Sequence, residues 1–195
     1  MGNCSGKLGR SACGSLGYAM PDAMHAKHVI VITDDLRSYP LIDWSIPETQ
    51  VDQVVVVDSI GDPKGIVSGT TKITRDPVGL AMAMDAVRVI RASGLLQDGF
   101  SFQTGAGGAS LAAAKFLKDV MLKENIHGSF GLGGITGYLV DMLNEGCFES
   151  LMDVQCFDLK AVESIRDNPR HQEISATHYA VSYTHLRAHE TLRHL

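Results

Sequence analysis

The sequence lacks the features that mark membrane, secreted or nucleic-acid-binding proteins. No apolar stretch approaches the roughly 20 residues needed to cross a bilayer, and the start, MGNCSGKLGR, has no hydrophobic signal core. The formal net charge of −5 and the absence of a Lys/Arg run leave no electrostatic footprint for nucleic acid or a membrane surface. We therefore expect a cytoplasmic protein with neither nucleic acid nor membrane among its partners.

Cysteine is also scarce, with four residues in a chain of 195: Cys4, Cys13, Cys147 and Cys156. They form no Cys-x-x-Cys pair, so the sequence predicts neither a disulfide framework nor a structural metal site. We expect four reduced, buried thiols. The 45% share of hydrophobic residues is typical of a globular protein with a sizeable core.

What is present is an alternation of apolar strands and amphipathic helices. Residues 28–33 and 53–61 are continuous β-branched runs, typical of parallel strands covered on both faces. Asp76 and Pro77 predict the start of a helix that Gly94 ends. One face of that helix carries Leu80, Met84, Val87 and Arg91.

The same alternation continues to the end of the pattern. We expect strands at 99–104, 129–132, 150–157 and 171–176, and helices at 110–123, 135–145 and, capped by Asp158, 159–168. The inward face of the helix at 110–123 carries Leu111, Ala114, Leu117 and Met121. Such βαβ units predict an α/β fold of open, mainly parallel sheets with flanking helices.

The spacing predicts two partial domains rather than one complete domain. Residues 1–75 are interpreted as the C-terminal part of a first α/β domain, residues 76–94 as a linking helix, and residues 95–180 as the N-terminal part of a second domain. The last residues, 181–195, have almost no apolar periodicity, and we expect them to be a non-native tail outside the functional argument.

Two glycine-rich segments follow neighbouring predicted strands: TGAGG at 104–108 and GLGGITG at 131–137. A strand, a glycine-rich turn and a helix together offer main-chain amides to an anion. A dinucleotide fingerprint is disfavoured because Ser110 stands where Gly or Ala is required and no acidic residue ends the next strand. Two readings remain open: a tight turn that lets the helix pack closely, and a cleft that admits an acyl thioester.

Four long segments, in order, resemble the α subunit of citrate lyase, a member of the CoA-transferase superfamily. They are GKLGRSACGSLGYAMPDA, GFSFQTGAGGASLAAAKFL, FGLGGITGYLVDMLNEG and LMDVQCFDLKAVESIRDNPRHQEISA. The resemblance covers residues 3–179 and implies a CoA-transferase-like fold. It also implies an exchange of citrate for acetate on an acyl carrier protein, giving citryl-carrier and acetate. The family chain is longer at both ends, so we interpret this sequence as an internal piece.

The resemblance also implies partners and a cofactor arrangement. The expected partners are citrate, the lyase β subunit and the acyl carrier (γ) subunit, in a hetero-oligomer. We expect no cofactor of the protein's own, because the acetyl thioester is carried on the CoA-like phosphopantetheine group of the acyl carrier. Many related transferases use a glutamate nucleophile near the second glycine segment, but residues 128–140 contain no carboxylate. The sequence therefore leaves the catalytic residue unknown.

The candidate site residues come from the two glycine segments and from scattered cations. We expect Gly105, Gly107 and Gly108 to approach the pantetheine or phosphate of the carrier, with Gly133, Gly134 and Thr136 facing the same pocket. Gln103 and Thr104 are candidate donors to a carboxylate. Because citrate carries three negative charges, Lys7, Arg10, Arg170 and His171 are candidate cations.

Two other classes of function stay open at this point. One is a nucleotide-binding α/β oxidoreductase, against which the Ser110 mismatch counts. The other is a piece of assembly scaffold without activity, since an incomplete sheet leaves an apolar face uncovered.

Overall fold

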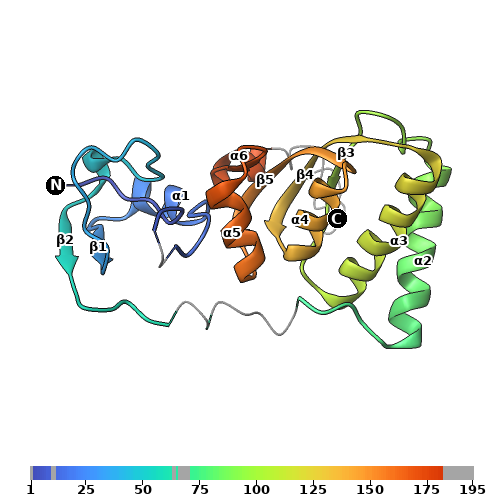
Figure 1. Ribbon diagram of the computed structural model, residues 1–195, viewed down its shortest axis with the longest axis horizontal. Helices are drawn as coiled ribbons and strands as arrows, with labels where there is room; N and C mark the ends of the chain where they lie inside the picture. The colour runs from blue at the N-terminus through green and yellow to red at the C-terminus, as the bar shows by residue number, and fades with distance from the viewer. Residues whose placement is uncertain (1, 10–11, 63–64, 66–70, 182–195) are drawn as a thin grey trace, which may run out of the picture.

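The computed structural model of the chain describes residues 2–9, 12–62, 65 and 71–181, and these form two lobes side by side (Figure 1). We call residues 2–62 the amino-terminal lobe and residues 71–181 the carboxyl-terminal lobe. The residues proposed as a non-native tail, apart from Val181, lie outside the described part. The observed fold is α/β with parallel sheets and flanking helices, as the sequence predicted.

The amino-terminal lobe contains one short helix and two parallel strands. Its elements are α1 (Ala19–His25), β1 (Ile30–Thr33), the 3₁₀ turn η1 (Glu48–Gln50) and β2 (Gln53–Val56). Val31 and Val54 pack against a small core centred on Ile46 and Val51. The opposite face, with Ile30 and Ile32, is more than half exposed. The prediction of strands covered on both faces is therefore wrong for the described residues, because no helix lies over that face.

The carboxyl-terminal lobe is a four-stranded parallel sheet in the order β3-β4-β5-β6. Its strands are β3 (Ser101–Gln103), β4 (Gly128–Ile135), β5 (Phe148–Cys156) and β6 (His171–Glu173), and its helices are α2 (Pro77–Ala92), α3 (Gly108–Glu124), α4 (Gly137–Asn144), α5 (Leu159–Asp167) and α6 (Ala176–Val181). Because consecutive strands are neighbours and crossovers are right-handed, α3, α4 and α5 cover the same face. One core joins Leu117 of α3, Leu139 of α4 and Ile165 of α5 to Phe148 and Leu151 of β5.

The start of α2 follows the predicted signals, but its buried face differs from the prediction. The Asp76 side chain accepts a hydrogen bond from the Gly79 amide at 2.7 Å, and Gly94 has a φ of +72° after the helix. Ala83 and Val87 are the buried residues, whereas Met84 and Arg91 are exposed. The predicted face was rotated too far, since the residue buried one turn before Val87 is the small Ala83 and the longer Met84 stays outside.

Helix α3 buries the predicted residues Leu111, Ala114, Leu117 and Met121. It begins at Gly108, two residues before the predicted start, and its last turn is followed by Asn125 in the left-handed region at φ 53°. Arg91 of α2 and Glu124 of α3 form an ion pair at the carboxyl ends of the two helices, so α2 and α3 run in the same direction.

The second glycine segment differs from the prediction of a turn after a short strand. Strand β4 continues through Gly133 and Gly134 to Ile135, and a register shift against β5 falls between the two glycines. Glycine carries no side chain to display the alternation of a strand, so the pair was interpreted as a turn. The helix that follows starts at Gly137 rather than at Ile135.

The end of the described chain is shorter in strand and richer in helix than predicted. Strand β6 stops at Glu173, and the chain turns at Ser175 into α6. The main-chain amide of Ala176 donates to the carbonyl oxygen of Gly17, which attaches α6 to the amino-terminal lobe. In the described residues, no helix combines the length and the apolar character that crossing a membrane requires.

Candidate functional site

The two glycine segments lie side by side at the carboxyl ends of β3 and β4. Gln103 is the register partner of Leu132, so the chain leaves both strands at the same edge of the sheet. A Cβ added to Gly133 would lie 3.6 Å from the carbonyl oxygen of Thr104. We call residues 103–108 and 133–136 together the glycine edge. In an open α/β sheet, this carboxyl edge is where ligands bind.

The glycines of this edge have different physical reasons for lacking a side chain. A Cβ on Gly134 would overlap the ring of Phe157, so packing requires a glycine there, whereas one on Gly108 would lie 3.1 Å from the main chain of Thr74, a tight contact. Gly133 has a φ of +122°, which disfavours any other residue. At Gly105 and Gly107 a Cβ would meet no described atom closer than 3.7 Å. Packing and backbone strain therefore do not explain these two glycines, whereas close approach of a ligand would.

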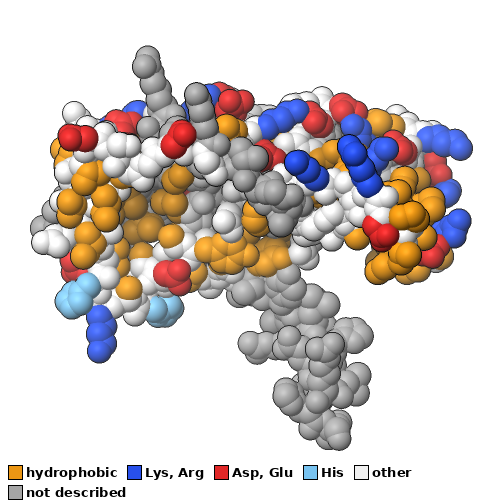
Figure 2. All heavy atoms as spheres, turned by 90° about the horizontal axis from the view of Figure 1, so that it is seen from below, with side chains coloured by type: hydrophobic (Ala, Val, Ile, Leu, Met, Phe, Trp, Pro, Cys, Tyr) orange, Lys and Arg blue, Asp and Glu red, His pale blue; other side chains and the backbone are white. Residues whose placement is uncertain are grey.

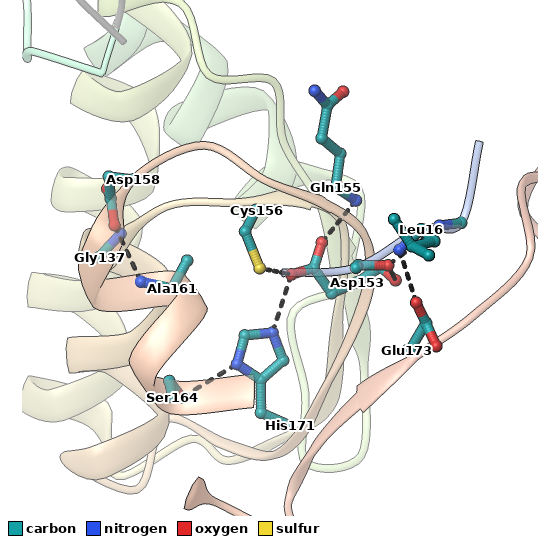
Figure 3. A network of polar contacts seen from close by, with 12 residues as sticks. Leu16, Gly137, Asp153, Gln155, Cys156, Asp158, Ala161, Ser164, His171 and Glu173 are labelled. Atoms are coloured by element: carbon teal, nitrogen blue, oxygen red, sulfur yellow. Dashed lines mark hydrogen bonds and ion pairs between the residues drawn. The ribbon is translucent and has the colours of Figure 1, made fainter. Parts of the chain in front are cut away.

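The helices α3 and α4 both begin at the glycine edge, but among the described residues only the amino terminus of α4 is capped by a negatively charged side chain. No described side chain caps α3, whose first-turn amides follow Gly107 directly. By contrast, the Asp158 carboxylate accepts from the Gly137 amide at 2.7 Å and from the Ala161 amide at 2.9 Å, so it caps both α4 and α5 (Figure 3). An added anion therefore fits the amino terminus of α3 better than that of α4.

The polar side chains at the glycine edge are partly committed to protein groups. Gln103 donates from Nε2 to the Tyr179 hydroxyl oxygen at 2.6 Å. The buried Thr104 hydroxyl donates to the Ser110 carbonyl oxygen at 3.3 Å. Thr136 is 1% exposed, and its hydroxyl has no hydrogen-bond partner within the described residues. Tyr179 of α6, which the sequence did not suggest, therefore contacts this edge.

The candidate cations do not gather at the glycine edge. Arg170 precedes β6, three strand spacings or about 14 Å from β3. Lys7 is buried in two ion pairs, and His171 is buried in a hydrogen-bond network. Arg10 lies outside the described residues. The structure thus brings Gln103 and Thr104 together with the glycines but places the described candidate cations elsewhere.

A buried polar network lies between β5, β6 and α5 (Figure 3). The Asp153 carboxylate accepts from the Gln155 amide at 2.7 Å and from the Cys156 thiol at 2.9 Å, and it lies 3.1 Å from Nε2 of His171. Nδ1 of His171 lies 2.9 Å from the Ser164 hydroxyl. Burial, together with the Asp153 charge, raises the pKa of the Cys156 thiol. A thiol held protonated in this way is a poor nucleophile.

The same side of the sheet carries the seam between the two lobes. Glu173 of β6 accepts from the Leu16 amide at 2.5 Å and from the Ser45 hydroxyl at 2.7 Å, and it lies 3.0 Å from the Lys7 ammonium. Ser15 adds a hydrogen bond to the Asp153 carbonyl oxygen at 2.8 Å. Burial lowers the pKa of Lys7, but its bonds to Asp43 and Glu173 outweigh that effect and raise it. Lys7 is therefore engaged in ion pairs with Asp43 and Glu173, the second of which joins the two lobes.

The amino-terminal lobe contains a cavity of about 560 Å³, within the usual range for small-molecule sites. We call it the amino-terminal cavity. It is lined by residues 2–6, Leu8, Ala12, Cys13, Leu16, residues 31–37, Tyr39, Leu41, residues 52–54 and Ile60. A second cavity of about 420 Å³ lies along the seam, lined by Lys7, Asp43, residues 165–169 and residues 171–173. Neither is lined by the glycine edge.

The thiols are only partly as predicted. All four cysteines are free, and Cys147 and Cys156 are buried, but Cys13 is exposed and Cys4 is half-buried. The expectation of four buried thiols is wrong for Cys4 and Cys13 because both line the amino-terminal cavity. Within the described residues, no group of three or more His, Cys, Asp and Glu side chains is placed to hold a metal ion.

Sequence reasoning found the capping role of Asp158 but missed Asp153 and Glu173. Both acidic residues stand within predicted strands, where a charged residue on a covered face signals a buried partner. That signal was present in the segments SLMDVQCF and HQEISA. The partners Lys7, Ser15 and Leu16 are more than 130 residues away and could not be identified from local patterns.

Comparisons with known proteins agree on one family. The family model for the citrate lyase alpha subunit (CitF) matches residues 1–190. The citrate lyase alpha chains of Klebsiella pneumoniae and Escherichia coli strain K12 are each 48% identical over 179 residues, or 92% of this chain. The chain spans 35% of the length of each of these relatives.

Two solved structures resemble the fold. A putative citrate lyase alpha subunit from Streptococcus mutans, in complex with citrate, is 48% identical with a TM-score of 0.81, over 90% of this chain and 34% of that one. The alpha subunit of a malonate decarboxylase from Acinetobacter baumannii is 23% identical with a TM-score of 0.56, over 82% of this chain and 30% of that one. The second likeness concerns the fold alone.

Proposed function

Because the chain belongs to the family of citrate lyase alpha subunits, we propose that its full-length protein is a citrate:acetyl-carrier transferase. The protein exchanges the acetyl group on an acyl carrier's phosphopantetheine thiol for citrate, producing citryl-carrier and acetate. The observation that carries the proposal is the family match over residues 1–190, joined to a glycine edge in which Gly105 and Gly107 leave the main chain open to a ligand.

We infer that the reaction proceeds by direct attack of citrate on the acetyl thioester. A citrate carboxylate oxygen adds to the acetyl carbonyl, the thiolate leaves, and a mixed anhydride forms. The thiolate then attacks the citryl carbonyl of this anhydride and expels acetate. Each addition places negative charge on a carbonyl oxygen, and preorganised main-chain amides stabilise such an oxyanion in a site shielded from water.

The absence of an enzyme carboxylate near the second glycine segment supports this scheme. Residues 128–140 contain neither Asp nor Glu, and the next carboxylate, Asp141, lies 2.5 Å from the Lys160 ammonium on the helix surface. A covalent glutamyl intermediate has no candidate nucleophile there. The reactants themselves supply both nucleophiles in a direct transfer.

We assign roles within the glycine edge by chemistry. The uncapped amino terminus of α3, with Gly105, Gly107 and Gly108, holds the reacting end of the prosthetic group or a carboxylate of citrate. Gly133, Gly134 and Thr136 form the wall contributed by β4. Gln103 and Thr104 are hydrogen-bond donors at the carboxyl end of β3, and Tyr179 accepts a hydrogen bond from the side-chain amide of Gln103.

The partners follow from the same proposal. The transferase works with a β subunit that cleaves the citryl thioester and with the acyl carrier, in the cytoplasm, and it needs no cofactor of its own. Arg10 and Arg170 remain candidate ligands of citrate in the full-length protein. The nucleotide-binding alternative is not favoured, since the matched family is not one of oxidoreductases.

The decisive experiment follows acetate release from acetyl-carrier and citrate by the full-length protein. We expect acetate to appear only when both reactants are present, and citryl-carrier to accumulate in equal amount. Omission of citrate is the control for simple hydrolysis of the thioester. The 195-residue chain, assayed in parallel, should show negligible turnover; rapid acetate release by it would refute the inference that the chain alone is inactive, and none by the full-length protein would refute the transferase assignment.

A further inference from the structure

The amino-terminal cavity has the size and lining of a ligand site, yet the proposed reaction at the glycine edge does not use it. Its floor includes Val31 and Val54, which are half-buried on the inner face of the β1–β2 sheet, and Leu16 also lines the cavity. The volume of about 560 Å³ suits an elongated small molecule. The lining belongs entirely to the amino-terminal lobe, which distinguishes the cavity from the glycine edge.

The charged side chains among the described lining residues are mostly acidic. Among the described lining residues, three carboxylates, Asp34, Asp35 and Asp52, stand against one guanidinium, that of Arg37. Arg37 is bound through Nε and Nη2 to Asp35, at 3.0 and 2.8 Å. A citrate or phosphate group brought here would meet the carboxylates of Asp34 and Asp52, which pair with no described lysine or arginine of the lining.

The polar groups of the cavity suit a ligand that is uncharged. Asp34 accepts from the Ile60 amide and Asp52 from the Val29 amide, so each carboxylate is anchored while its remaining lone pairs can still accept hydrogen bonds. A molecule with an apolar body and a few N–H or O–H donors would pack against the apolar lining and donate hydrogen bonds to these carboxylates. The arm of a phosphopantetheine group beyond its phosphate has this chemistry: a dimethyl-bearing carbon, a hydroxyl and two amides.

A short structural path joins the cavity to the glycine edge. Leu16 lines the cavity, and the carbonyl oxygen of the next residue, Gly17, accepts from the amide of Ala176 at 2.8 Å. Ala176 begins α6, and Tyr179 of the same helix contacts Gln103 of the glycine edge. Helix α6 has six residues and rises about 9 Å. Helix α6 therefore contacts a residue next to the cavity lining at its amino end and the glycine edge through Tyr179.

We propose that the amino-terminal cavity binds the uncharged pantetheine arm of the acyl carrier, while the carboxylates of citrate bind at the glycine edge. The proposal rests on the function proposed above and divides the reactants between the two lobes by charge. The acetyl thioester at the end of the arm is then presented toward the helix amino terminus where citrate carboxylates are favoured.

The cysteines of the chain supply a direct measurement of occupancy. Cys13 is exposed and lines the cavity, whereas Cys147 and Cys156 are buried elsewhere. We would alkylate the full-length protein with N-ethylmaleimide and follow Cys13 by peptide mass spectrometry. The probe is S-methyl-pantetheine, which is uncharged and cannot react with thiols. With the probe at ten times its Kd, labelling of Cys13 should slow about tenfold, because only the unoccupied fraction reacts.

Matched variants locate the binding site. Val54→Trp fills the cavity from its floor and should abolish the protection. Met24→Trp, at an exposed position of α1 outside the cavity lining, is the control and should leave it intact. Leu36→Trp, at the exposed rim, is a second blocking variant that does not depend on accommodating bulk in the lobe core.

Three results would overturn the proposal. One is unchanged Cys13 labelling at saturating probe, and another is equal protection by citrate. The third is protection that survives both blocking variants. The binding measurement needs no turnover, so it is separable from the transferase assay: acetate release without Cys13 protection removes this proposal alone, and protection without acetate release removes the proposed reaction alone.

Discussion

Glu173 of β6 and Lys7 of the amino-terminal lobe form a 3.0 Å ion pair whose side chains are 4% and 10% exposed. The remaining acceptor capacity of Glu173 goes to the Leu16 amide and the Ser45 hydroxyl, so one carboxylate collects three donors from the opposite lobe. Lys7 is also bound to Asp43 at 2.8 Å. A buried charge is tolerated when its partners are complete, and removal of one partner leaves the others uncompensated.

Substitution of this carboxylate should destabilise the chain strongly. We expect Glu173→Ala to lower the free energy of unfolding by about 3–5 kcal/mol, because Lys7 and two other donors lose a buried acceptor. Glu173→Gln keeps the shape and one acceptor oxygen and should cost less. Urea denaturation measures both. Glu149→Ala, at an exposed position on β5, is the control and should stay within about 0.5 kcal/mol of the parent.

The double cap at Asp158 gives a second stability prediction. Because the carboxylate caps both α4 and α5, Asp158→Ala should cost about twice the roughly 1 kcal/mol of a single cap. Asp141→Ala removes only the exposed ion pair to Lys160 and should cost less than about 1 kcal/mol. Thermal denaturation of the two variants tests the comparison, and equal losses would contradict the capping role.

Alkaline pH should loosen the seam. The pKa of Lys7 is raised in the folded state, so its contribution to stability is complete below its ordinary pKa of 10.5 and is lost as pH rises through the higher folded value. The free energy of unfolding should therefore fall above about pH 10.5. Lys7→Met should show a smaller fall over the same interval, which isolates Lys7 from the Cys156 thiol. A curve of identical slope in the two proteins would argue against this assignment.

Alanine substitutions at the glycine edge can distinguish glycines needed for packing from glycines needed for the approach of a ligand. Gly134→Ala should destabilise the chain by about 1–3 kcal/mol, because the added Cβ overlaps the Phe157 ring. Gly105→Ala has room for its Cβ and should unfold like the parent. In the full-length protein, however, Gly105→Ala should raise KM or lower kcat for transfer. Normal kinetics in a stable Gly105→Ala protein would remove Gly105 from the proposed site.

Local patterns predicted much of the fold, for physical reasons that individual elements make clear. Helix α3 displays a complete inward face from Leu111 to Met121, and Asp76 and Asp158 cap their helices as their positions indicated. The end of β4 was missed because Gly133 and Gly134 show no alternation. Helices α1 and α6 have seven and six residues, too few to display a periodic face.

The site was accessible to sequence reasoning only in part. Neighbouring parallel strands end at one edge, so the adjacency of the segments at Gly105 and Gly133 follows from the strand order alone. The contact of Tyr179 with Gln103 and the ion pairs of Lys7 join residues far apart in the chain. Such contacts depend on how the lobes pack together, and the spacing of apolar residues along the sequence carries no information about that packing.

The placement of the amino-terminal lobe has a consequence for how the larger sheet can grow. That lobe lies beside the β6 end of the sheet (Figure 1), and its Leu16 and Gly17 bond to Glu173 and Ala176 there. Within the described residues, β3 pairs only with β4. The side open to a further strand is therefore that of β3.

Hydrophobic side chains reach the surface at both ends of the molecule (Figure 2), at Ile32 and Val56 on one lobe and at Val78, Met82 and Val89 on the other. From β3 to β6, each strand lies on the same side of the one before it. A later strand that paired with the open side of β3 would reverse this strand order. A reversal of this kind opens a crevice between the two diverging crossovers. The crevice would begin directly above Gly105 and Gly107.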